Sequence, residues 1–293
     1  MGAPEGQGTH LSRASIIALL VDLHEPRALR AFLSRHGYSP QKSLGQHFLC
    51  SKRVSRAIAI ALHGMKGALE IGPGPGALTS LLCEVCESVE AIELDARAES
   101  ALSESAPCAK VTLGDALSVD WAEILERLPR PRTIVSNLPY LITGPLLGRV
   151  EDHALRIDLA VLMMQAEVAD RVRAAAGDSA RGALSVTMQC LFCIEKVVEA
   201  PPGCFVPPPK VQSTVLKLTP RKHVDWVRAA EIKRLSHLGF RQPRKTLLNN
   251  LSLQYSKSAV AEAIEEVKLA ASVRPHQLEL EHWELLVRRL SGL

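Results

Sequence analysis

The chain of 293 residues is long enough for one large domain and a smaller one, and its 47% of hydrophobic residues excludes global disorder. The formal net charge is only +4, so the total charge does not by itself indicate a nucleic-acid partner. The first ten residues lack the basic and apolar runs of a signal peptide, and residues 15–21 are too short an apolar stretch to cross a bilayer. We therefore expect a cytoplasmic protein with no membrane partner.

Two short helices are predicted before residue 38. They cover residues 11–23 and 26–36, and the second has Pro26 at its start and Gly37 just past its end. We expect residues 1–37 to form an N-terminal helical extension.

Between residues 68 and 164, short apolar runs alternate with helical patterns, as in a doubly wound (Rossmann-like) α/β fold with a mostly parallel sheet. The first run, residues 68–71, leads into the glycine turn 72–76 and then into a helical pattern. Glycine lets a ligand come close to the backbone, and the start of a helix offers free N–H groups. The turn therefore predicts half of a nucleotide-cofactor site.

The next three apolar runs each end in a polar side chain, namely Glu93, Asp115 and Asn137. The carboxyl ends of parallel strands share one crevice, so we expect these residues to line it together with Gly72. Glu93 follows the glycine turn by about 20 residues, where doubly wound folds bind a ribose diol. Asp115 suits an adenine amino group, and acidic side chains suit the positive charges of S-adenosylmethionine (SAM) better than a pyrophosphate. NAD stays open as an alternative, because the glycine spacing also fits its fingerprint.

The fourth run ends in the tetrapeptide Asn-Leu-Pro-Tyr, residues 137–140. The Asn137 side chain and the Pro139 carbonyl can accept the two N–H bonds of an exocyclic amino group, and Tyr140 can stack on its ring. Acceptors outside the ring plane favour a pyramidal nitrogen with a free lone pair, which can attack a methyl group. We expect direct methyl transfer to an adenine that is flipped out of its stack. A simple strand-to-loop turn is the alternative, since Asn and Pro are common turn formers.

The pattern changes after residue 164. Two helices and a closing pair of strands are predicted around a proline-rich loop, and only helical patterns follow. We therefore expect a SAM-dependent methyltransferase domain over residues 38–222 and a smaller all-helical C-terminal domain over residues 223–293. The predicted elements are helices at 165–175 and 183–192, strands at 194–198 and 214–218, a helix capped by Asp225, and helical stretches that begin at Pro243, Lys257 and Glu279.

Positive charge is concentrated in two segments. Residues 210–245 contain ten Lys/Arg against Asp225 and Glu231, and residues 26–53 contain six with no acid. Such clustering indicates contacts with phosphates, although a solvated surface gives the same pattern.

Seven cysteines include two Cys-x-x-Cys pairs, Cys83/Cys86 and Cys190/Cys193. Zinc is an alternative for such pairs, but they lie far apart within apolar patterns. We expect small buried side chains that are kept reduced, and no bound metal.

Taken in order, these motifs resemble the KsgA family of small-subunit (16S) ribosomal RNA adenine N6-dimethyltransferases. The resemblance covers about residues 27–290, and its order and spacing are more specific than any single motif. It implies transfer of methyl groups from SAM to N6 of two adjacent adenines near the 3′ end of that RNA, during biogenesis of the small ribosomal subunit. The matching blocks are residues 42–49, 70–79, 93–95, 114–116, 137–140, 205–213 and 244–247.

The resemblance also implies roles for individual residues. The residues expected at the cofactor are His47, Leu49, Gly72, Glu93, Asp115 and Asn137. Tyr140 and Phe205 would flank the target adenine, with Asn137 and Pro139 at its amino group. Without the resemblance, packing in the core is the alternative for Phe205. The basic residues expected at the RNA are Lys210, Arg241, Arg244 and Lys245, and we expect the enzyme to act as a monomer.

The sequence departs from the common pattern of the family at three places. Many relatives have Asn where His47 stands, Asn-Ile-Ser where residues 141–143 read Leu-Ile-Thr, and a further Arg where Pro243 stands. None of these changes removes a group that the chemistry needs.

Two other functions stay open beside an NAD-dependent oxidoreductase. One is a large-subunit RNA methyltransferase of the antibiotic-resistance type, which shares the Asn-x-Pro-Tyr motif. The other is a non-catalytic RNA-binding factor in ribosome assembly that keeps only the fold. The blocks 205–213 and 244–246 favour the small-subunit enzyme over the first, and the complete set of cofactor residues favours it over the second.

Overall fold

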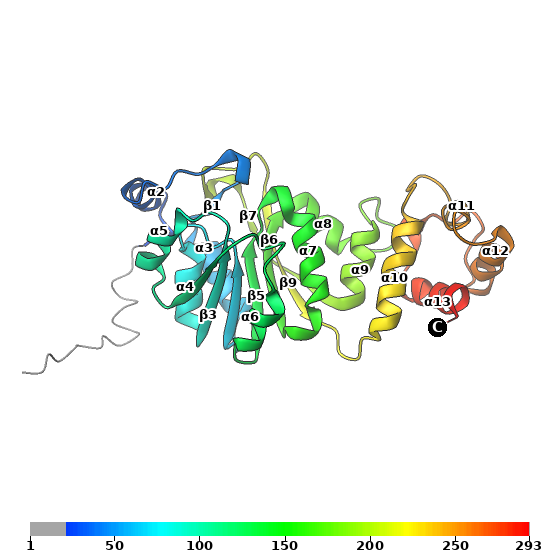
Figure 1. The fold of residues 1–293 in the computed structure, drawn as a ribbon. Helices are drawn as coiled ribbons and strands as arrows, with labels where there is room; N and C mark the ends of the chain where they lie inside the picture. Colours follow the sequence, from blue (N-terminus) through cyan, green and yellow to red (C-terminus); the bar gives the residue numbers. More distant parts are fainter. Residues whose placement is uncertain (1–21, 293) are drawn as a thin grey trace, which may run out of the picture.

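The computed structural model describes residues 22–292. The helix predicted over residues 11–23 therefore lies almost wholly outside the described residues. The described chain has two parts that lie side by side: a sheet with helices on both faces, and a group of helices that holds the C-terminus (Figure 1). None of the helices within residues 22–292 is both long and apolar enough to span a membrane.

Within residues 22–292, seven strands form one mixed sheet in the order β4-β3-β2-β5-β6-β9-β7. The first five strands in this order are parallel, and β9 runs antiparallel to both β6 and β7. This confirms the predicted doubly wound fold and its closing pair of strands. The strands are β2 (Gly67–Ile71), β3 (Ser88–Glu93), β4 (Ala109–Leu113), β5 (Arg132–Asn137), β6 (Leu159–Gln165), β7 (Phe192–Ala200) and β9 (Ser213–Pro220).

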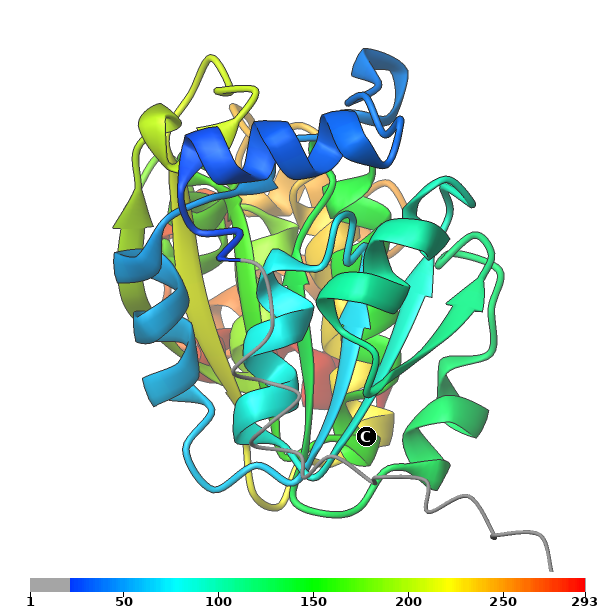
Figure 2. The same cartoon turned by 90° about the vertical axis from the view of Figure 1, so that its left-hand side faces the viewer.

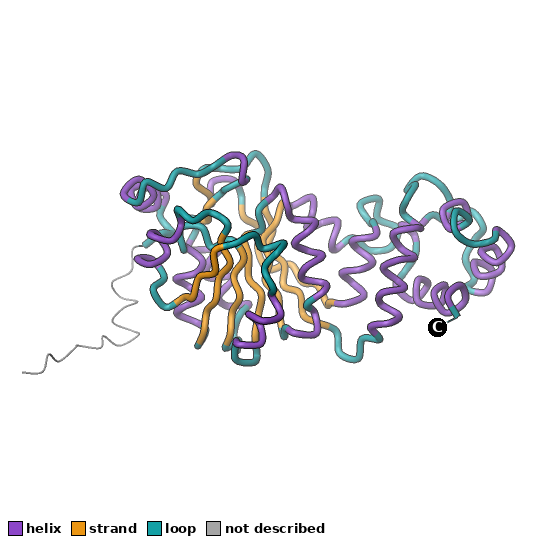
Figure 3. Tube along the Cα trace, viewed as in Figure 1, coloured by secondary structure: helices purple, strands orange, loops and turns teal. Residues whose placement is uncertain are grey.

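Helices cover both faces of the sheet, which explains why its central strands are continuous apolar runs (Figure 3). On one face, α3 (Lys52–Ala61) and α4 (Ala77–Val85) pack on the strands. The opposite face has a second core cluster. The helices there are α6 (Trp121–Arg127), α7 (Thr143–Asp152), α8 (Ala166–Arg173) and α9 (Ala183–Leu191).

The N-terminal segment lies across the carboxyl ends of the parallel strands (Figure 2). Helix α2 (Pro26–Arg35), predicted from its initial proline, packs its apolar side against α5 (Ala98–Ser105). A short turn, η1 (Lys42–Leu44), leads into β1 (Phe48–Leu49), which pairs antiparallel with β8 (Phe205–Val206). The sequence patterns do not predict this two-stranded ribbon, because it joins segments that are far apart in the chain.

The C-terminal part contains helices only, as predicted (Figure 3). The Asp225 side chain caps the first of them by accepting from Arg228 N at 3.0 Å. The prediction of a helix from Pro243 is wrong, because Thr246 caps the second helix and the residues before it form a loop. The helices are α10 (Trp226–Gly239), α11 (Leu247–Leu251), α12 (Lys257–Glu266) and α13 (Leu280–Ser291).

A buried carboxylate joins the two parts. Glu151 of α7 accepts from Thr187 Oγ1 of α9 at 2.8 Å and pairs with Lys233 Nζ of α10 at 2.7 Å. Val186 of α9 also belongs to the core of the C-terminal helices. Because α9 packs on both sides, the boundary expected at residue 222 stays a prediction.

The cysteines differ from expectation. Cys83 is buried as predicted, but it forms a disulfide with Cys108, so the expectation that it is kept reduced is wrong. The bond ties α4 to the chain just before β4. Cys193 is exposed rather than buried. Among residues 22–292, no three His, Cys, Asp or Glu side chains are placed to share a metal ion, and the absence of a metal stays a prediction.

Candidate active site

A pocket opens where the parallel strands end. It brings together the predicted residues of four strand ends, as the shared crevice of a doubly wound sheet requires. The η1 turn and the residues after it close the pocket from the N-terminal side. The lining includes Ser43, Leu44, Gln46, His47, Gly72, Gly74, Glu93, Leu94, Asp115, Asn137, Leu138, Pro139, Tyr140 and Leu141.

The glycine turn lies directly against this pocket. Gly72 and Gly74 have φ values of 69° and 55°, in the left-handed region that side chains disfavour. A Cβ at Gly74 would also lie 2.7 Å from the Phe48 ring, so a side chain there would displace β1. The turn thus lets the Phe48 ring pack directly against its backbone at the wall of the pocket.

Glu93 holds this turn to the end of β3. Its Oε2 accepts from Gly74 N at 2.9 Å and its Oε1 accepts from Asp95 N at 2.8 Å. Burial raises the pKa of the Glu93 carboxyl, and these two N–H donors oppose the rise. Each oxygen keeps a lone pair for a further donor, so the carboxylate fits the two hydroxyls of a ribose.

Asp115 stands at the end of β4 on an exposed turn. Its Oδ1 accepts from Leu117 N at 2.9 Å, which fixes the carboxylate by a local turn. Its Oδ2 has no partner within residues 22–292, so it can accept from an adenine amino group.

Asn137 has a defined orientation. Its Nδ2 donates to His47 O at 2.8 Å. A carbonyl oxygen only accepts, so this bond fixes which end of the amide is nitrogen. The Oδ1 atom therefore points away from His47 O, and within residues 22–292 it has no hydrogen-bond partner.

The backbone after Asn137 corrects one expectation. Pro139 O, the predicted second acceptor, already accepts from Ile142 N at 3.2 Å and from Thr143 Oγ1 at 3.0 Å. Leu138 also lines the pocket, and its carbonyl has no partner among the described residues. The open acceptor is thus one residue earlier than predicted, and nothing in the tetrapeptide itself distinguishes the two carbonyls.

Tyr140 is held at both ends of its side chain. Its hydroxyl lies 2.6 Å from Ser213 Oγ, and its ring lies beside the His47 imidazole, with 5.4 Å between ring centroids and 30° between planes. His47 Nδ1 donates to Pro207 O at 2.8 Å. Neither Ser213 nor these contacts of His47 were expected from the sequence, although block 205–213 ends at Ser213.

Comparison with known proteins identifies the family to which this chain belongs. The family model described as ribosomal RNA adenine dimethylase matches residues 38–290. The chain belongs to this family. The family predicted from the motifs is therefore confirmed.

Curated relatives and solved structures that are similar to this chain support the same family assignment. Ribosomal RNA small subunit methyltransferase A of Acidobacterium capsulatum is 40% identical, over 90% of this chain and 94% of its own length. The protein of that name from Synechococcus elongatus is 38% identical, over 83% and 92%. A dimethyladenosine transferase from Plasmodium falciparum has a TM-score of 0.70 at 25% identity, over 82% of this chain and 96% of its own. The 23S rRNA methyltransferase ErmE has a TM-score of 0.62 at 26% identity, over 83% and 99%.

Two residues expected in the site of this dimethylase lie outside its pocket. Leu49 and Phe205 are paired with each other in the β1–β8 ribbon and are buried in the core beside α3 and α4. The ribbon turns both side chains inward, away from the ligand space. Contact of Leu49 with the cofactor and of Phe205 with the base stay predictions, and neither side chain lines the pocket in this structure.

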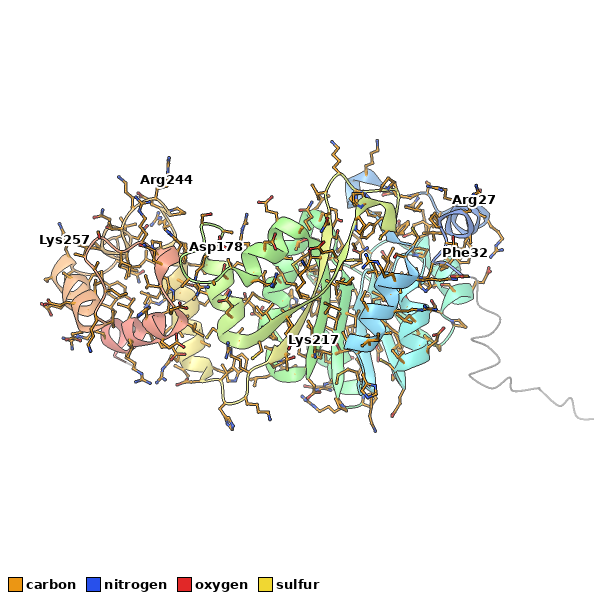
Figure 4. The ribbon with its side chains drawn as sticks, turned by 180° about the vertical axis from the view of Figure 1, so that it is seen from behind. Arg27, Phe32, Asp178, Lys217, Arg244 and Lys257 are labelled. Carbon is orange, nitrogen blue, oxygen red and sulfur yellow. A yellow bond between two sulfur atoms is a disulfide. The ribbon has the colours of Figure 1, made fainter. Side chains whose placement is uncertain are left out.

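The basic residues expected at the RNA are all exposed. Lys210 follows β8, and Arg241, Arg244 and Lys245 lie on the loop between α10 and α11. Figure 4 shows Arg244 projecting from the upper edge of the molecule, the edge on which the strand ends also lie in Figure 1. The dimethylase thus presents this loop and its pocket on the same side.

Three of the other basic residues in the segment 210–245 form ion pairs with acidic side chains. Arg228 pairs with Asp225 at 3.5 Å, Lys233 with Glu151 at 2.7 Å, and Arg234 with Glu231 at 2.7 Å. Their charges are compensated within the chain. Within residues 22–292, the exposed Arg241, Arg244 and Lys245 form no ion pair, and the contact of this loop with phosphates stays a prediction.

Proposed function

We propose that this protein transfers methyl groups from SAM to N6 of two adjacent adenines near the 3′ end of 16S ribosomal RNA, during biogenesis of the small subunit. The observation that carries the proposal is the pair of open acceptors at the end of β5. Asn137 and Leu138 are neighbours in the chain that both line the pocket, and neither Asn137 Oδ1 nor Leu138 O has a hydrogen-bond partner within residues 22–292. An exocyclic amino group has two N–H donors for two such acceptors.

The strand ends fit the methyl donor. We infer that Glu93 binds the ribose hydroxyls of SAM and that Asp115 binds its adenine amino group. The glycine turn lets SAM approach the backbone at this edge of the pocket. SAM supplies an electrophilic methyl group on a positively charged sulfur. The acidic residues around the pocket stabilise that positive charge. Glu93 has a fixed position there, because its carboxylate accepts hydrogen bonds from Gly74 N and Asp95 N.

The chain's own residues then prepare the nucleophile. Asn137 Oδ1 and Leu138 O accept from the amino group of the target adenine and draw its lone pair out of the ring plane. Tyr140 stacks on the base, which must leave its helix to reach the pocket. The lone pair forms the new N–C bond as the C–S bond breaks, and the extra proton on nitrogen leaves to water. Positioning and hydrogen bonding are sufficient for this step.

The relatives favour the small-subunit substrate over the alternatives. The curated relatives at 40% and 38% identity are small-subunit methyltransferases by name. The large-subunit alternative rests on ErmE, which is similar over 83% of this chain at 26% identity. A non-catalytic assembly factor has no need of two open acceptors beside an ordered glycine turn.

Mapping of methylated adenines in cells tests the proposal. Ribosomal RNA from cells that lack the protein should lose methylation at two adjacent adenines of the small-subunit RNA, and re-expression of the wild-type chain should restore it. Intact small-subunit methylation, with loss in the large-subunit RNA instead, would contradict the proposal.

We also infer a monomeric, metal-independent enzyme that acts in the cytoplasm, with residues 38–222 as the methyltransferase domain and residues 223–293 as the RNA-binding domain. Light scattering at micromolar concentration should give the mass of one chain. Methyl transfer should persist in the presence of a chelator.

A further inference from the structure

Ser213 is the first residue of β9 and lies at the end of the sheet where the parallel strands finish and the pocket opens. Its backbone is paired with Gln165, at the end of β6, and with Ala200, at the end of β7. Its side chain is fully buried. Two neighbouring strands therefore fix the position of its hydroxyl.

This fixed hydroxyl holds the tip of Tyr140. The two oxygens are 2.6 Å apart, within the usual range of an O–H···O hydrogen bond. Tyr140 begins the short turn η2 (Tyr140–Ile142) and follows Leu138, which carries the second open acceptor, by two residues. The His47 imidazole supports the ring and is itself held by Pro207 O. The ring is thus fixed by its backbone, by its hydroxyl and by a neighbouring ring.

We propose that Ser213 is a positioning residue that fixes the ring plane of Tyr140 and thereby orients the target base. The inference rests on the proposed function, in which Tyr140 stacks on that base. A ring that is already fixed loses no rotational freedom when the base arrives. It also sets the angle at which the amino group meets Asn137 Oδ1 and Leu138 O, and small errors in such an angle slow a transfer strongly. The antiparallel strand β9 thus has a role in the chemistry as well as in closing the sheet.

A double-mutant cycle tests this coupling. Ser213→Ala and Tyr140→Phe each remove the same hydrogen bond from opposite ends. Each should lower the single-turnover rate at saturating RNA and SAM by roughly three- to tenfold, the effect of one hydrogen bond. The double variant should be no slower than the slower single variant, because the bond can be lost only once. The affinity for SAM should stay at the wild-type value in all three.

A base analogue gives a readout that general destabilisation does not produce. RNA with 2-aminopurine in place of the target adenine should gain fluorescence when the base leaves its helix, and stacking on Tyr140 should quench part of that gain. Ser213→Ala should weaken this quenching. Ser185→Ala is the matched control, because Ser185 is also a buried hydroxyl of the same part of the chain but bonds to Arg171 O. It should leave the quenching and the single-turnover rate at wild-type values.

The inference is overturned if the losses in rate multiply in the double variant, or if Ser213→Ala keeps wild-type rate and quenching. Thermal melts identify folded variants. If Ser213→Ala does not fold, Tyr140→Phe alone decides, and a wild-type rate and quenching in that variant overturn the inference. Failure of the proposed function looks different: the wild-type protein itself would then transfer no methyl group to the RNA.

Discussion

Glu70 is a carboxyl group that the fold keeps away from water. It lies on β2 two residues before the glycine turn, is 1% exposed, and its Oε2 has no hydrogen-bond partner within residues 22–292. Burial raises the pKa of Glu70 to about 8; the nearby Thr79 hydroxyl opposes the rise and the Glu93 carboxylate adds to it. The group is therefore a neutral acid in the folded protein at pH 7. Its replacement by Gln tests whether the difference between its folded and unfolded pKa values lowers the stability of the fold.

The direction in which pH changes the free energy of unfolding depends on which state binds the proton more tightly. The unfolded chain releases the proton near pH 4.5 and the folded protein near pH 8, so the folded state binds the extra proton between these values. The free energy of unfolding therefore falls as pH rises through this window, by up to about 1.4 kcal/mol per pH unit. Between pH 4.5 and 7 the loss reaches about 3 kcal/mol. Glu70→Gln is neutral in both states and removes the loss.

Urea unfolding of both proteins at pH 5, 6, 7 and 8 measures the effect. Glu70→Gln should exceed the wild type in free energy of unfolding by about 3 kcal/mol at pH 7, with the difference shrinking toward pH 5. Glu90→Gln is the control, because Glu90 is also buried but pairs with Arg127 at 2.8 Å. That variant should be less stable than the wild type at pH 7. A difference for Glu70→Gln that stays constant from pH 5 to 8 would refute the reasoning.

Three further changes test the binding surfaces. Glu93→Ala should weaken SAM binding in calorimetry by roughly 1–3 kcal/mol, while NADH gives no heat with either protein. Replacing Arg244 and Lys245 by Ala should weaken RNA binding and flatten its log–log salt dependence by up to about two units, with SAM affinity unchanged. Arg234→Ala, which removes an ion-paired charge, should change that slope less. Asn250→Ala releases the backbone of the loop before α11 and should raise the KM for RNA in steady-state assays more than it lowers kcat.

The strand ends could be predicted from sequence because each belongs to a local pattern. The apolar runs before Gly72, Glu93, Asp115 and Asn137 predicted four neighbouring parallel strands, and the structure places these residues around one pocket. The rule that parallel strand ends share a crevice needs only the order of the strands. It does not need their contacts.

Features that depend on contacts between distant segments were missed. The bond from Tyr140 to Ser213 and the ribbon of β1 with β8 join segments far apart in the chain. The ribbon also buries Phe205, which the resemblance to the family placed beside the base, and that contact stays a prediction. The choice between the Leu138 and Pro139 carbonyls depends on Thr143 binding the latter, which sequence spacing does not show.

Local sequence patterns also gave wrong predictions for the start of one helix and for the state of one cysteine. Pro243 is typical of a helix start, but the Asn250 side chain binds both Gln242 N and Gln242 O and so holds a loop there. Cys83 belongs to a Cys-x-x-Cys pair within an apolar pattern, and we predicted that it is kept reduced. The disulfide instead joins Cys83 to Cys108, which lies outside that motif.

The most direct test of the proposed chemistry is single-turnover methyl transfer from SAM to an under-methylated small ribosomal subunit, with the wild type and Asn137→Ala compared. Loss of the oriented Oδ1 acceptor should lower the rate by about 10²-fold, the effect of one preorganised group in a transition state, with little change in RNA affinity. Thermal melts of the variant should match those of the wild type. A folded Asn137→Ala protein that transfers methyl groups at the wild-type rate would contradict the assignment of the active site.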